Sequence, residues 1–365
     1  MLTFLWNQIV ISIRKRFHFE GEEHEKAKER SSYEKLIKSS EVRIHKEALF
    51  DFLSKEDGSD INVVTELGLT PLRRAIRLGN VGITKRLIEG SNGANLNAID
   101  SIGWTPLTFA VHCDELKIID FLITYGGSDP NYYDGNQWTP LHRAIADERL
   151  DAAKCLIKHG ADVNKEDDKG WTPLIAAIHR DNCEIVTILS TKEANLNLID
   201  SGGWTPLSYA IEAEKVEMVK HLIDLGTDVN QEDGKGWAPL RIAIYKKNFE
   251  IIKLLSKNEA TVNSIDSLGW TPLTYAIDEK KMEIVKLLVE NGADFNNHGP
   301  DWLTPFQRAI LDNEKEMVKL FMENGADSKI RTRSLQVQHK HNSFELAIKE
   351  DQMDILKQLL HYSKE

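Results

Sequence analysis

Long apolar runs are missing from this chain of 365 residues, and cysteine is scarce. No run approaches the roughly 18 to 20 apolar residues that a membrane-spanning helix requires. The three cysteines, Cys113, Cys155 and Cys183, are an odd number and show no CxxC spacing, which excludes a small disulfide-stapled scaffold. We therefore expect reduced thiols and a cytoplasmic protein.

Positive charge is also in deficit. The 46 Lys and Arg residues face 57 Asp and Glu residues, giving a formal net charge of -11 and an isoelectric point near 5.6. An acidic surface repels phosphate backbones, so a nucleic-acid partner is not expected. Charged residues make up 28% and apolar residues 41% of a chain without low-complexity tracts, which is typical of a folded, soluble protein.

The signatures of common enzymes are absent. There is no Gly-x-Ser-x-Gly elbow, no Gly-x-x-x-x-Gly-Lys phosphate loop and no His-Glu-x-x-His motif. His339 and His341, together with His298, offer donor atoms for a metal, but the supporting partners that such a site needs are not visible. We predict that the protein is not an enzyme and has no metal and no cofactor.

What the sequence does contain is a repeat. The tripeptide Thr-Pro-Leu, or a near copy, recurs through Pro71, Pro106, Pro140, Pro173, Pro206, Pro239, Pro272 and Pro305. From Pro140 onward the spacing is 33 residues, and a second marker, a glycine that opens a string such as Gly160-Ala-Asp-Val-Asn164, keeps the same period. Glu193 and Glu259 stand where two of these glycines would fall. Two markers repeating in phase indicate stacked modules of one kind.

Local physics predicts two helices in each module. Thr172 can cap a first helix that begins at Pro173, where the missing N–H of proline has no cost. Ile185, Val186, Ile188 and Leu189 recur at helical spacing and give a second helix an apolar face. Such a pair cannot bury its own apolar face, so stability must come from stacked neighbours.

These markers resemble the ankyrin repeat. The stretch from Thr139-Pro140-Leu141-His142 to Gly160-Ala161-Asp162-Val163-Asn164 follows that pattern closely. Gln137, Ile145 and the Ala152-Ala153 pair depart from it without disturbing the helical pattern. The resemblance covers residues 31–365 and implies an all-α solenoid of ten units, two of them divergent caps, as one domain. It also implies a structural hydrogen bond, not a catalytic role, for His142.

The resemblance places recognition residues on a concave groove and on the turn fingers between modules. One such position, the residue before Thr or its substitute Ala238, is tryptophan six times: Trp104, Trp138, Trp171, Trp204, Trp237 and Trp270. They can act as staples that pack on the fourth helical residue, as Trp104 would on Phe109, or they can leave an exposed apolar strip for a partner. Both interpretations hold if one ring edge packs and the other stays open.

The residues that close the first helix vary in charge from module to module. From the first regular module to the seventh they are Arg77, His112, Asp147, His179 with Arg180, Glu212, Tyr245 with Lys246, and Asp278 with Glu279. Structural repetition does not require such variation, so we predict that it serves a specific partner. The predicted contact residues are the six tryptophans with His112, His179, Arg180, Tyr245 and Lys246.

A separate segment precedes the modules at the amino-terminal side. Residues 1–30 are predicted to form an amphipathic tail and a charged linker, with Leu2, Leu5, Trp6, Ile9 and Ile13 on one helical face. Residues 1–19 can be a helix that covers the end of the solenoid, an anchor on a membrane surface or a targeting peptide. Residues 328–342 form a basic insertion that is either a solvated finger or a docking loop for an acidic partner.

Two hypotheses for the function follow. The first is a monomeric adaptor, inhibitor or scaffold that binds a protein partner along the groove and fingers. The alternative is a membrane-tethered docking protein anchored by residues 1–19.

Overall fold

The computed structural model describes residues 70–89, 93–266, 268–296, 298–299, 302–331 and 341–362. Those residues fall into two compact units, one within residues 1–161 and one within residues 162–365. Throughout the described residues the regular elements are α-helices, and no strand occurs among them. The all-α prediction is confirmed. The tail, the linker, the first divergent repeat, the domain boundary at residues 30 and 31, and residues 332–340 of the insertion lie outside the described ranges.

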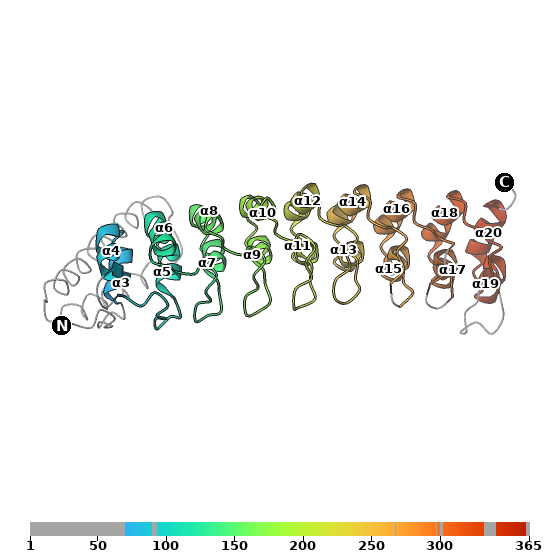
Figure 1. Ribbon diagram of the computed structural model, residues 1–365. Helices are drawn as coiled ribbons and strands as arrows, with labels where there is room; N and C mark the ends of the chain where they lie inside the picture. Colours follow the sequence, from blue (N-terminus) through green and yellow to red (C-terminus); the bar gives the residue numbers. More distant parts are fainter. Residues whose placement is uncertain are drawn as a thin grey trace, which may run out of the picture. The chain divides into compact units, whose positions relative to one another are not determined.

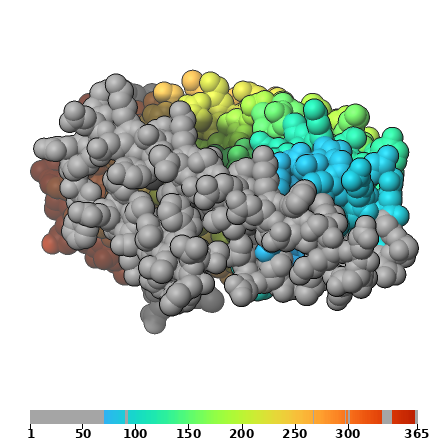
Figure 2. Space-filling model, turned by 90° about the vertical axis from the view of Figure 1, so that its left-hand side faces the viewer, coloured from blue at the N-terminus to red at the C-terminus, as the bar shows by residue number. Residues whose placement is uncertain are grey.

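The described part of the first unit, residues 70–89 and 93–161, contains three helix pairs. They are α3 (Pro71–Arg77) with α4 (Val81–Glu89), α5 (Pro106–His112) with α6 (Leu116–Thr124), and α7 (Pro140–Ala146) with α8 (Leu150–Lys158). Within this unit each first helix packs on the next first helix, and each second helix on the next second helix. Figure 2 shows the contact between the pair α3 and α4, in blue, and the pair α5 and α6, in cyan.

The second unit contains six pairs of the same design. They are α9 (Pro173–His179) with α10 (Cys183–Ser190), α11 (Pro206–Glu212) with α12 (Val216–Asp224), α13 (Pro239–Tyr245) with α14 (Phe249–Lys257), α15 (Pro272–Asp278) with α16 (Met282–Glu290), α17 (Pro305–Leu311) with α18 (Lys315–Glu323), and α19 (Ser343–Lys349) with α20 (Met353–Tyr362). First and second helices form two rows, and the loops between pairs extend past the first helices as fingers (Figure 1).

Each first helix begins where the sequence predicts. In seven of the eight helices that begin with proline, a threonine hydroxyl accepts the backbone N–H of the third helical residue, as Thr172 does from Ile175 at 3.3 Å. The eighth helix, α13, starts after Ala238 and has no side-chain cap. Helix α19 lacks the proline and instead uses a capping box between Asn342 and Glu345.

The core lies between the two rows of helices and between successive pairs. Leu174, Ala177 and Ile178 from α9 are buried, as are Ile185 and Leu189 from α10. In six modules the asparagine that ends the string ties neighbouring modules together. In the second unit the Nδ2 of Asn164 donates to the carbonyl of Glu193 at 3.2 Å, and its Oδ1 accepts the N–H of Asn195 at 2.9 Å. One side chain thus satisfies backbone groups of the next module.

The glycine marker is explained by backbone conformation. Gly160, Gly226, Gly292 and Gly325 have φ between 83° and 87°, in the left-handed region that ends a helix. Glu193 and Glu259 occupy the same position with φ of 64°, where a side chain costs roughly 1 to 2 kcal/mol. A Cβ on Gly226 or Gly292 would meet nothing within 4 Å, so the penalty is one of backbone conformation and not of space.

We expect Glu193→Gly to raise the free energy of unfolding by about 1 kcal/mol, because glycine adopts this φ without strain. Chemical denaturation followed by circular dichroism measures the change. The reciprocal variant Gly226→Glu should lower stability by a similar amount. If both variants were as stable as the intact chain, the left-handed backbone at this position would not be a source of strain.

No helix among the described residues is long and apolar enough to cross a membrane.

Candidate protein-binding surface

The six tryptophans sit at the base of the fingers, where an aspartate holds each of them. In the second unit the backbone N–H of Asp200 donates to the carbonyl of Trp204 at 3.0 Å, and the Oδ1 of Asp200 accepts the N–H of Trp204 at 2.7 Å. The same two bonds join Asp100 to Trp104, Asp134 to Trp138, Asp167 to Trp171, Asp233 to Trp237 and Asp266 to Trp270. These two bonds close the turn and fix the backbone position of the tryptophan.

The indole rings are half-buried against the helix that follows. Trp104 lies 6.3 Å from Phe109, Trp204 lies 5.6 Å from Tyr209, and Trp270 stacks on Tyr275 at 5.0 Å between ring centroids. These are the staple contacts that the sequence predicted. All six tryptophans have intermediate exposure, so part of each ring also remains open to solvent.

A cation lies over every one of these rings, a feature that the sequence analysis missed. In the first unit the guanidinium of Arg143 lies 4.6 Å from the Trp104 centroid and 4.7 Å from that of Trp138. In the second unit the partners are Lys169 over Trp171, Lys235 over Trp204, Arg241 over Trp237 and Arg308 over Trp270. Such contacts stabilise by about 0.5 to 2 kcal/mol and hold the ring orientation.

The predicted contact residues at the ends of the first helices divide into two groups. His112 and Lys246 are engaged in cross-module pairs, His112 Nδ1 with Asp147 Oδ2 at 2.8 Å and Lys246 Nζ with Glu212 Oε1 at 2.6 Å. In contrast, His179, Arg180 and Tyr245 are exposed.

Two side chains of this second group, His179 and Tyr245, lie beside half-buried indoles. The ring of His179 lies 5.1 Å from that of Trp171. Tyr245 is 61% exposed, and its ring meets the edge of Trp237 at 5.6 Å.

Further cross-module pairs account for much of the charge variation in the second unit. Lys247 pairs with Glu279 at 2.6 Å, Arg308 with Asp278 at 3.6 Å, and Lys280 with Glu314 at 3.0 Å. At these positions, a positive charge on one module therefore faces a negative charge on its neighbour. Part of the helix-end charge variation is therefore explained by ion pairs between neighbouring modules.

A partly buried polar cluster supports the finger before Trp270. Arg241 Nη1 lies 2.7 Å from Asp266 Oδ2, and the Tyr275 hydroxyl donates to the same oxygen at 2.7 Å. Burial opposes the charge of Asp266, but the backbone N–H of Trp270, the Tyr275 hydroxyl and Arg241 outweigh it, so the pKa of Asp266 lies below its usual value. Burial and the bond to Asp266 raise the pKa of Tyr275 to about 12, so it stays a donor at neutral pH.

The fingers carry a second feature that the sequence analysis missed. Their tips expose apolar side chains: Ile99 and Ile102 in the first unit, and Ile199, Ile265 and Leu268 in the second, with exposures between 40% and 64%.

A small cavity lies beside the cluster of Arg241, Asp266 and Tyr275. Its volume is about 10 Å³, which is the space for one water and not for a small ligand.

Comparison with known proteins gives the family. The model of ankyrin repeats (3 copies) matches residues 40–134, 141–233 and 225–299, and that of ankyrin repeats (many copies) matches residues 114–157. The chain belongs to the ankyrin-repeat family. A similar solved structure is the ankyrin repeat domain of Bcl-3, described as a unique member of the IkappaB protein family. Its TM-score is 0.57 with 25% sequence identity, over 61% of this chain and 99% of that chain. Comparison with curated protein sequences gave no significant match.

Ankyrin repeats are in general non-enzymatic modules for protein–protein interaction. The structural role implied for His142 is confirmed: its Nδ1 lies 2.8 Å from the buried hydroxyl of Thr139.

Three histidines are considered as metal ligands from the sequence. One of them, His339, lies outside the described ranges. His298 and His341 do not fall in the donor cluster found among the described residues, which consists of Asp120, Cys155 and His159. The sequence analysis did not single out this cluster, because its members come from two modules.

Proposed function

We propose that this ankyrin-repeat chain is a non-enzymatic adaptor, inhibitor or scaffold that binds a protein partner through its fingers and first-helix ends. The observation that carries the proposal is where the exposed apolar and aromatic side chains lie. In the second unit, Tyr245 closes a first helix while Ile265 and Leu268 occupy a finger tip, and each is more than half exposed. Exposed apolar groups gathered on one type of surface mark interaction sites.

A protein partner explains these features better than other ligands do. The small hollow beside Asp266 cannot hold a metabolite, and the formal charge of -11 disfavours a nucleic-acid partner. Aromatic residues and arginine are enriched among the residues that dominate protein–protein binding energy. Tyr245 and Arg180 are such residues, and both are exposed at the ends of first helices.

The tryptophans have a supporting role in this proposal. Each ring is oriented by its aspartate and its cation, and its open part adds apolar surface beside the exposed residue that follows on the helix. Trp171 does so beside His179, and Trp237 beside Tyr245. A preorganised aromatic surface loses little conformational entropy when a partner binds.

We expect the triple variant His179→Ala, Arg180→Ala, Tyr245→Ala to bind its protein partner at least about tenfold more weakly, because truncation removes three exposed contacts of the hot-spot type. The partner is captured from the native lysate with the intact chain and identified by mass spectrometry. Its affinity for each purified variant is then measured by calorimetry.

The matched control is Tyr125→Ala. Tyr125 is 77% exposed, but it follows the second helix α6 and stacks on Phe121, away from the first-helix ends. This variant should keep full affinity. Equal binding by the triple variant would show that the partner uses another surface, and failure of the intact chain to retain any specific protein would contradict the proposed function.

A further inference from the structure

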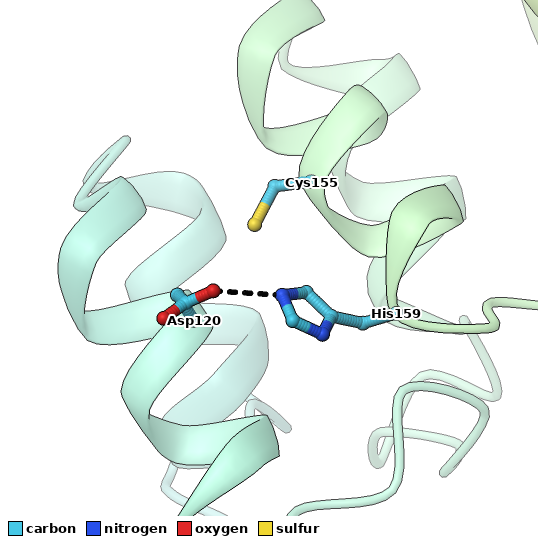
Figure 3. Close-up of side chains that lie close together, drawn as sticks. All are labelled: Asp120, Cys155 and His159. Carbon is cyan, nitrogen blue, oxygen red and sulfur yellow. Dashed lines mark hydrogen bonds and ion pairs between the residues drawn. The ribbon is translucent and has the colours of Figure 1, made fainter.

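Three side chains with metal-binding donor atoms meet on the second-helix row of the first unit. Asp120 belongs to α6, Cys155 to α8, and His159 directly follows α8. Their donor atoms all lie within 4.8 Å of one another. Figure 3 shows the thiol of Cys155 directed toward the pair formed by Asp120 and His159.

The local structure explains this convergence. Cys155 and His159 are four residues apart, which places both on the same face at the end of α8. Helices α6 and α8 pack against each other, and this brings Asp120 opposite that face. Asp120 Oδ1 and His159 Nε2 are 2.8 Å apart, so the carboxylate and the ring already face each other across the two helices.

We propose that Asp120, Cys155 and His159 form a binding site for a divalent transition metal, with Zn²⁺ as the preferred ion. Zinc accepts nitrogen, oxygen and sulfur donors together, whereas Mg²⁺ and Ca²⁺ prefer oxygen alone. Three protein ligands leave the fourth tetrahedral position to water or to a ligand from outside the chain.

Zinc binding would require only small movements of the three donor atoms. Tetrahedral zinc with bonds of about 2.0 to 2.3 Å separates its donors by roughly 3.3 to 3.7 Å. The oxygen and nitrogen therefore move slightly apart, and the sulfur moves inward. The side chain of Asp120 is 50% exposed and free to adjust, whereas that of His159, at 14%, is held in place.

A nucleophilic role for Cys155 is a weaker explanation of the same cluster. Burial, together with the charge of Asp120, raises the pKa of the Cys155 thiol, so it is protonated at neutral pH when no cation is present. His159 Nε2 is paired with Asp120 and is not directed at the sulfur. A metal ion uses all three groups at once.

The test is titration of the full-length, tag-free reduced chain with zinc chloride, followed by calorimetry, and with cobalt chloride, followed by absorbance. We expect a single equivalent of zinc to bind and cobalt to give a thiolate charge-transfer band. Asp120→Asn, Cys155→Ser and His159→Gln should each weaken zinc binding more than tenfold, and Cys155→Ser should abolish the cobalt band.

The controls are Cys113→Ser and His221→Gln. Cys113 is a second thiol in the same unit, and His221 also bridges second helices, but its Nε2 meets the Thr187 hydroxyl at 2.8 Å and the carbonyl of Cys183. Both controls should bind zinc as the intact chain does. Absence of zinc binding by the intact chain overturns the proposal. So does unchanged binding by Cys155→Ser, a near-isosteric variant whose fold is verified by circular dichroism.

Discussion

Replacing Phe321 by alanine is expected to lower the free energy of unfolding of the second unit by about 3 to 5 kcal/mol. Phe321 on α18 has no exposed surface, and its ring packs against Phe295 at 5.6 Å and against the edge of Phe306 at 6.3 Å. Alanine would remove the shared centre of this aromatic cluster and leave a cavity. Urea denaturation monitored by far-UV circular dichroism measures the loss.

The same substitution at Phe249 provides the comparison. Phe249 is the first residue of α14 and is 39% exposed, so Phe249→Ala should cost less than about 1 kcal/mol. A cost for Phe321→Ala no larger than that for Phe249→Ala would mean that the aromatic cluster does not anchor these modules.

The second large effect is expected at Arg241. Its guanidinium pairs with Asp266, lies 4.0 Å from the Trp237 centroid and 4.6 Å from that of Tyr275, and only 11% of its side chain is exposed. Arg241→Met keeps most of the apolar stem but leaves Asp266, 7% exposed, without its cation. Removing one member of a fully buried pair costs about 3 kcal/mol or more, so for this mostly buried pair we expect a loss of roughly 2 to 3 kcal/mol, measured by the same denaturation.

Lys247→Met is the matched control for Arg241→Met. Lys247 and Glu279 are paired at 2.6 Å, but their side chains are 47% and 39% exposed, so this loss should cost at most about 1 kcal/mol.

The pH dependence of the free energy of unfolding gives an independent test of the role of Asp266. Because the folded-state pKa of Asp266 is lowered, its stabilisation is complete above its unfolded pKa of about 4 and is lost as the pH falls through the folded value. Asp266→Asn should weaken this acid sensitivity, and an unchanged acid transition would contradict the role of Asp266.

The sequence predicted most of the fold because each module repeats the same local signals. A threonine before seven of the eight helix-starting prolines caps the helix, and in most modules a glycine ends the second helix, so the helix ends follow from residues close together in the chain. The staple contacts could also be predicted, since Trp104 and Phe109 are only five residues apart.

The rest of the surface depends on contacts one module apart. Arg143 lies over Trp104 from 39 positions further on, and Lys246 meets Glu212 at a separation of 34. Asp120 and His159 are likewise 39 positions apart. Nothing local distinguishes these side chains from ordinary solvated ones. Comparison of each charged residue with those one repeat period away would have revealed the ion pairs, but not the cations over the indoles.

The ion pairs between first-helix ends restrict how this array can be rebuilt. Helix α13 ends at Tyr245 and is followed by Lys246 and Lys247, which contact Glu212 of the preceding module and Glu279 of the following one. An engineered array that inserts a second copy of the α13–α14 module beside the first would set lysines against lysines. Lengthening this protein by duplication is therefore expected to lose a modest part of the stacking energy unless the charges of the new copy are recoded.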